Sequence, residues 1–146
     1  MNSRRAKIII DIFMTVFVVL AFIRWDGTAG VVYHIAVGSV CIALFGLHVF
    51  VHRKWIKAVT RSCFAGVLKR AARWKYITDM LLIVVWSMSV VTGIVAIFPF
   101  FGGELGPFEW GRFHGVTARI GLGLLVIHVL QHIPQIKSYL PIKRIG

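Results

Sequence analysis

The sequence predicts an all-α integral membrane protein, a four-helix up-and-down transmembrane bundle with both termini in the cytoplasm. Three observations predict it: an apolar composition, four long apolar runs, and a one-sided distribution of basic residues. The chain has 146 residues, of which 58% are hydrophobic and 15% are charged. A soluble domain of this size cannot cover so much apolar surface, so the composition indicates a protein that lies in a bilayer.

The four apolar runs are the predicted membrane spans, because a helix needs about 20 residues to cross a hydrocarbon core of about 30 Å. They lie at about residues 6–24, 31–52, 77–101 and 112–133 of a single domain covering residues 1–146. Basic residues precede the first run, as in a signal peptide, but no small-residue cleavage site follows it, and we interpret it as a retained span. Short loops on one side predict that the second and fourth spans run parallel.

The basic residues set the predicted orientation. The net charge of +12 would suit a nucleic-acid-binding protein, but the 17 Lys and Arg residues are not arranged as one binding face. Three precede the first span, eight lie between the second and third, and three follow the fourth, whereas the opposite side has only Arg24 and Arg112. This positive-inside pattern predicts a multi-pass protein of a bacterial or archaeal cytoplasmic membrane, in contact with lipid and not with nucleic acid.

The basic cytoplasmic stretch Arg53–Lys75 has apolar residues at near-helical spacing between its charges. One interpretation is an interfacial helix on anionic headgroups, and the other is a solvated basic linker. Trp55 and Trp74 bracket the stretch, which favours the interfacial helix, because tryptophan concentrates at membrane interfaces.

All six histidines fall in two spans and share one spacing. The second span holds His34, His48 and His52, and the fourth holds His114, His128 and His132. Both follow H-x13-H-x3-H, and one offset of 80 residues relates all three pairs. Parallel helices would place the members of each pair at equal depth. A single membrane histidine is more often a structural hydrogen-bonding group, but packing gives no reason to repeat this spacing, and polar groups at this depth are usually functional.

Two imidazoles in each layer fit an iron porphyrin better than a bare metal ion. A zinc site takes four protein ligands in one place, commonly with cysteine or carboxylate among them. An iron porphyrin needs only two axial ligands from the protein. Cys41 and Cys63 form no Cys-x-x-Cys-His site, so covalent haem attachment is excluded and the expected groups are b-type (heme b).

The spacing also indicates which layers hold haem. His34 and His48 are separated by 14 residues, about 21 Å along a helix, and 14 residues make four turns of a left-handed bundle with about 3.5 residues per turn. His52 overshoots that face, and its layer lies only about 6 Å from that of His48, too close for a second macrocycle. We therefore expect two haems, an outer one on His34 and His114 and an inner one on His48 and His128.

Glycine and arginine residues near these layers are further candidates for cofactor binding. Gly38 and Gly121 would let a flat macrocycle approach the backbone, although small residues also serve ordinary helix packing in membranes. Arg24 and Arg112 lie near the outer haem propionates in the predicted topology. Arg119 lies about 140° away from the haem face, where propionate neutralisation, a salt bridge to a partner and snorkelling all stay open.

A second set of polar residues lies at the cytoplasmic edge of the spans: His52, His132, Asp11 and Asp79. A quinone that accepts electrons here also needs protons, which a carboxylate or histidine can relay. Alternatively, these groups contact haem propionates or pair with nearby Lys and Arg.

Several motifs resemble those of a known family, the transmembrane di-haem cytochrome b superfamily, in its small four-helix, bis-histidine members. The matching segments are Leu47-His48-x3-His52-x2-Trp55, Ser87–Gly93 and His114…His128-x3-His132. The resemblance implies electron transfer across the membrane, often to or from quinone, as a subunit beside a soluble redox partner. Two features depart from relatives that anchor respiratory enzymes: all ligands lie on two helices, and Ile133-Pro134 follows His132 where a tryptophan follows His52.

Three functions compete at this point. The first is a b-type di-haem cytochrome of a respiratory chain, carrying electrons between the quinone pool and a redox partner subunit or soluble carrier, alone or as an oligomer. The second is a self-contained quinone-linked oxidoreductase acting on a small oxidant such as superoxide, with an aromatic outer loop around its site. The third is a metal or proton transporter that uses the histidine layers as a pathway.

Overall fold

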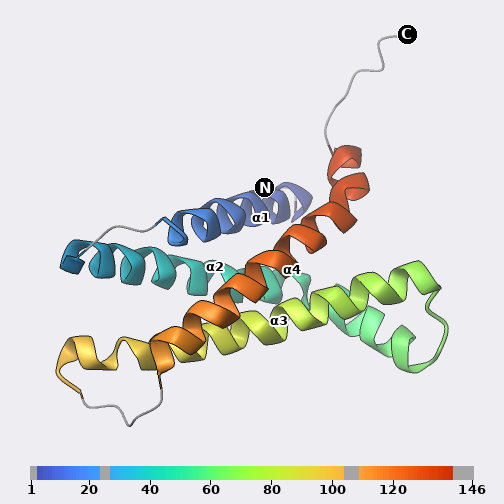
Figure 1. Cartoon of the computed structure of the whole chain (residues 1–146). Coiled ribbons are helices and arrows are strands. Elements are labelled where there is room, and N and C mark those ends of the chain that lie inside the picture. The colour runs from blue at the N-terminus through green and yellow to red at the C-terminus, as the bar shows by residue number, and fades with distance from the viewer. Residues whose placement is uncertain (1–2, 24–26, 104–108, 140–146) are drawn as a thin grey trace. The chain divides into compact units, whose positions relative to one another are not determined.

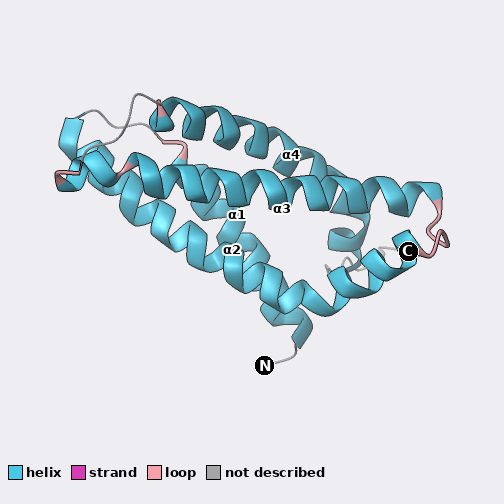
Figure 2. Ribbon diagram, turned by 90° about the horizontal axis from the view of Figure 1, so that it is seen from below, coloured by secondary structure: helices cyan, strands magenta, loops and turns pink. Residues whose placement is uncertain are grey.

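The computed structural model describes residues 3–23, 27–103 and 109–139, and these are helical almost throughout. The elements are α1 (Ser3–Ala21), α2 (Gly27–Phe64), α3 (Arg70–Ala96), the short 3-10 helix η1 (Phe98–Phe101) and α4 (Trp110–Tyr139). Within these ranges there is no β-strand, and short loops join the helices (Figure 2). The all-α class predicted from the sequence is confirmed.

Three segments are long and apolar enough to cross a membrane, which indicates a multi-pass membrane protein: Gly27–Phe64, Arg70–Phe101 and Trp110–Pro134. Their apolar side chains face outwards, as Val91 and Leu130 do with 58% of their surface exposed. Lipid is the natural solvent for such surfaces. The first predicted span is the helix α1, but α1 differs from the others because four of its nineteen residues are charged: Arg4, Arg5, Lys7 and Asp11.

The chain divides into two compact units, of which the first, Met1–Ser62, is the hairpin of α1 and α2. The two helices are antiparallel neighbours (Figure 1). Near the loop, the Tyr33 hydroxyl donates to the carbonyl oxygen of Leu20 at 3.1 Å. Further along, the ring of His48 reaches the carboxylate of Asp11. These contacts fix the register of α1 against α2.

The second unit, Cys63–Gly146, contains the antiparallel pair α3 and α4. Small polar residues are buried between them, among them Ser89, Thr92 and Thr117. The threonine hydroxyls donate back to carbonyl oxygens of their own helices, Thr92 to Met88 at 2.8 Å and Thr117 to Phe113 at 3.1 Å. Their burial is therefore compensated locally, and the small side chains let the two helices approach closely.

The basic stretch 53–75 is divided between the end of α2 and the start of α3, and its place at the membrane interface stays a prediction. Its first twelve residues continue α2 without a break, since no glycine or proline interrupts them, and the turn comes at Gly66, which has a φ of +71°. At about 1.5 Å per residue α2 is about 57 Å long, well beyond a hydrocarbon core of about 30 Å. The helix α4 likewise continues past the predicted end, through Pro134 to Tyr139.

Candidate metal or cofactor centre

A cluster of three polar side chains joins α1 to α2 inside the first hairpin. Asp11 comes from α1, and His48 and His52 follow one another at one helical turn on α2. The Nδ1 atom of His48 lies 2.7 Å from Oδ1 of Asp11, and the Nε2 atom of His52 lies 3.7 Å from the same oxygen. The two imidazole rings are 4.6 Å apart with an angle of 37° between their planes.

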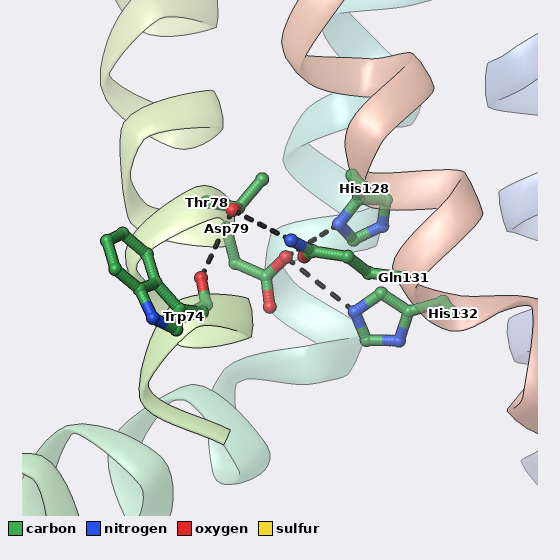
Figure 3. A network of polar contacts seen from close by, with 6 residues as sticks. All are labelled: Trp74, Thr78, Asp79, His128, Gln131 and His132. Carbon is green, nitrogen blue, oxygen red and sulfur yellow. Dashed lines mark hydrogen bonds and ion pairs between the residues drawn. The ribbon is translucent and has the colours of Figure 1, made fainter. Parts of the chain in front are cut away.

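The second hairpin contains the same cluster, built by Asp79 of α3 with His128 and His132 of α4 (Figure 3). The corresponding distances to Oδ1 of Asp79 are 2.6 Å from His128 Nδ1 and 3.7 Å from His132 Nε2. The rings again lie 4.6 Å apart at 37°. The two hairpins therefore repeat not only the histidine spacing but also the position of a carboxylate on the neighbouring helix.

The two clusters differ in their surroundings. The side chain of Asp79 is 7% exposed, whereas that of Asp11 is 43% exposed. Beside Asp79, the Gln131 amide donates to the Thr78 hydroxyl at 3.2 Å, and that hydroxyl donates to the Trp74 carbonyl oxygen at 3.1 Å (Figure 3). The second cluster is thus more enclosed and better connected than the first.

Four buried polar atoms around the clusters have no hydrogen-bond partner among the described residues. They are His52 Nε2, His132 Nε2, Asp79 Oδ2 and Gln131 Oε1. Buried polar atoms are nearly always satisfied in folded proteins, so a group of unsatisfied ones points to a ligand, a water or a proton carrier that they receive. The prediction that His52 and His132 belong to an edge site for quinone or protons fits these atoms and stays a prediction.

The outer histidines of the two hairpins are also held alike. Nδ1 of His34 lies 3.0 Å from the carbonyl oxygen of Ala21 on α1, and Nδ1 of His114 lies 2.9 Å from that of Ser89 on α3. A carbonyl oxygen can only accept, so in both rings Nδ1 carries the proton and the lone pair is on Nε2. The same reasoning applies to His48 and His128, whose Nδ1 atoms donate to carboxylates.

The ring of His114 lies against Gly93, the last residue of the Ser87–Gly93 segment noted in the sequence but not itself a predicted site residue. A Cβ atom at Gly93 of α3 would lie 2.9 Å from Cε1 and 3.0 Å from Nδ1 of His114. The Ser89 hydroxyl oxygen lies 3.4 Å from the same Nδ1. Gly93 is therefore the position at which α3 makes room for this imidazole.

The other residues predicted to bind a cofactor, three arginines and two glycines, differ in what surrounds them. Arg112 is exposed and pairs with Glu109 at 3.3 Å, Arg119 is exposed on α4, and Arg24 lies outside the described residues. Nothing lies within 4 Å of a Cβ at Gly38, whereas a Cβ at Gly121 would meet Nε1 of Trp86 at 3.2 Å. Packing between α3 and α4 is sufficient to account for Gly121, and the cofactor-binding roles of all five residues stay predictions.

The Asp-His-His clusters could hold a metal ion, but their shortest separations are those of a hydrogen bond. Each Asp-His-His cluster has three potential ligand atoms within 4.8 Å of one another. However, two ligands of a tetrahedral ion with bonds of about 2.0–2.1 Å lie about 3.3 Å apart. The separations of 2.7 and 2.6 Å between carboxylate oxygen and Nδ1 are those of a charge-assisted hydrogen bond. That bond engages Nδ1 of His48 and of His128 and does not involve Nε2.

Comparison of the chain with protein-family models, with curated proteins and with solved structures gives no match. The two hairpins and their histidines therefore carry the functional argument alone.

Proposed function

We propose that the chain is a b-type di-haem membrane cytochrome that carries electrons across the membrane between the quinone pool and a redox partner. The observation that carries the proposal is a repeated contact: in each hairpin an outer and an inner histidine place Nδ1 within hydrogen-bond distance of an acceptor on the neighbouring helix. Metal-binding histidines are commonly held in this way, with the other ring nitrogen directed to the metal.

In this proposal each haem takes one imidazole from each hairpin. His34 and His114 hold the outer haem, and His48 and His128 hold the inner one. The haem iron supplies one-electron oxidation and reduction. The residues of the chain fix the tautomer and the orientation of the four rings. His52 and His132 lie beside the inner pair, where a quinone exchanging electrons and protons would need them.

The proposed topology has four spans in a bacterial or archaeal cytoplasmic membrane, with both termini and the turn around Gly66 inside. Lipid and quinone are the expected small partners, and a redox partner subunit or soluble carrier receives or supplies the electrons. The basic C-terminal part of α2 lies where anionic headgroups would attract it.

The experiment that tests the function is a haem count on the purified full-length chain. Two non-covalent haems per chain are expected, extractable with acidified organic solvent and visible in reduced-minus-oxidised spectra. The expectation follows from two pairs of matched imidazoles and from the absence of a Cys-x-x-Cys-His site. One haem, or none, in fully folded protein would contradict it.

The topology has a separate test by cysteine labelling. In a chain whose Cys41 and Cys63 are replaced by alanine, Val67→Cys is expected to react with a membrane-impermeant thiol reagent only from the cytoplasmic side. Glu109→Cys is expected to react only from the outside, because the positive-inside pattern places the two loops on opposite sides. Both native residues are exposed, so access to the reagent is assured. Labelling of Glu109→Cys from inside would reverse the orientation.

A second candidate function is a transition-metal transporter, which the three-ligand clusters favour. It predicts a colourless protein that binds one metal ion per cluster, and it predicts that Asp11→Asn and Asp79→Asn abolish metal binding. The absorbance spectrum and metal analysis of one purified sample distinguish it from the cytochrome.

A further inference from the structure

We infer that Asp11 and Asp79 are positioning residues for the inner pair of axial imidazoles, and that their charge makes the inner ligands stronger donors than the outer ones. The inference rests on the proposed function and deepens it, because it assigns the carboxylates to His48 and His128 and orders the two haems by midpoint potential.

The first step is the geometry of the bond between each carboxylate and its histidine. Nδ1 of His48 donates to Asp11 over 2.7 Å, and Nδ1 of His128 donates to Asp79 over 2.6 Å. Distances this short are typical of charge-assisted hydrogen bonds. A carboxylate bound to the far nitrogen of a metal-binding imidazole fixes the tautomer and the ring orientation, and raises the basicity of the ligating nitrogen.

The second step is that each carboxylate comes from the neighbouring helix of the same hairpin. The bond from Asp11 ties α1 to α2, and that from Asp79 ties α3 to α4. The next histidine along the helix, His52 or His132, lies 4.6 Å from the ligand ring and restricts its rotation from the other side. Each hairpin alone therefore orients its inner ligand, and it does so in the same way in both.

The third step is the contrast with the outer pair. There Nδ1 lies at hydrogen-bond distance from the backbone carbonyl oxygens of Ala21 and Ser89, and these two acceptors carry no net charge. An anionic acceptor increases the electron density at the ligating nitrogen more than a neutral one does. A more strongly donating ligand stabilises ferric over ferrous iron, so the inner haem is expected to have the lower midpoint potential.

The sharpest test separates the charge of the carboxylate from its hydrogen bond. In Asp11→Asn the amide oxygen can still accept from His48, but the negative charge is lost. In Asp11→Ala both are lost. The same pair of variants is made at Asp79. Each full-length protein is analysed by haem content, by redox titration and by the low-spin ferric EPR signal, which depends on the relative orientation of the two axial rings.

The asparagine variants are expected to keep both haems and to raise the midpoint potential of the inner haem alone. Each tenfold loss in the stabilisation of ferric over ferrous haem raises the midpoint potential of a one-electron couple by about 59 mV. The alanine variants are expected to change the inner EPR signal as well, or to bind the inner haem 10- to 100-fold more weakly, as loss of such a partner does elsewhere. Asp11 is more exposed than Asp79, so replacing it is expected to destabilise the folded protein less.

Glu109→Gln is the matched control, because it removes one negative charge from an exposed pair with Arg112 and is expected to leave the inner potential unchanged. If the wild-type chain holds two haems but the asparagine variants shift neither potential, or shift both equally, the inference is wrong and the proposed function stands. If the wild-type chain holds no haem, the proposed function itself fails.

Discussion

Replacing His48 or His128 with alanine is expected to remove the inner haem and to leave the outer one, so that the haem content falls from two per chain to one. Replacing His34 or His114 is expected to do the reverse. The reason is that each of these rings is oriented by a hydrogen bond from Nδ1 to the neighbouring helix, and in the proposed function its Nε2 atom would bind the iron. Loss of an axial imidazole removes a bond to iron.

The matched controls are His52→Ala and His132→Ala, one helical turn further along. Their Nε2 atoms lie 3.7 Å from the carboxylates and have no hydrogen-bond partner among the described residues. Both variants are expected to keep two haems and to alter the inner potential or the rate of quinone chemistry. Haem counting on all six variants decides the assignment. If His52→Ala loses the inner haem while His48→Ala keeps it, then the 18-residue spacing from His34 is the correct one.

The histidines could be predicted from the sequence because their spacing repeats. Asp11 and Asp79 could be placed at the same edge of the spans as His52 and His132, but their bonds to His48 and His128 could not be predicted. Asp79 follows Asp11 by 68 residues, but the histidines repeat at 80. The difference of twelve arises from two features of the second hairpin: α3 continues further beyond Asp79 than α1 does beyond Asp11, and the connection that contains η1 is longer than that between α1 and α2. Insertions in a loop shift one helix of a hairpin relative to the other in sequence while their packing stays the same. Only the structure shows that both aspartates occupy the same place.

Other differences have equally local causes. The second span was predicted to end at residue 52, yet the residues from Arg53 onwards have no helix breaker before Gly66 and extend α2 to Phe64. The all-α class was predictable because long apolar runs admit few alternatives in a bilayer. Glycine was the least informative signal, since Gly38 faces open space and Gly121 packs against Trp86.

Gly93→Ala is expected to remove most of the outer haem and to leave the inner one, although it adds only a methyl group. In the structure a Cβ at this position would lie 2.9 Å from Cε1 and 3.0 Å from Nδ1 of His114. The imidazole would have to shift, and because its Nδ1 is held by the Ser89 carbonyl oxygen at 2.9 Å, the shift strains that hydrogen bond and changes the direction of Nε2. In a helix interior alanine is otherwise favoured over glycine by about 1 kcal/mol, so a weakened helix cannot explain the loss.

Gly111→Ala is the control for the methyl group itself, because it lies on α4 three residues before His114 and has nothing within 4 Å of the added Cβ. It is expected to retain both haems. Redox-titrated spectra of the two variants, normalised to folded protein, give the content of each haem. In Gly93→Ala the spectral signal of the outer haem should be lost, or should become that of a high-spin haem with one axial ligand. Full retention of a low-spin outer haem at unchanged potential would show that His114 is not the ligand that Gly93 accommodates, and would reassign the outer pair.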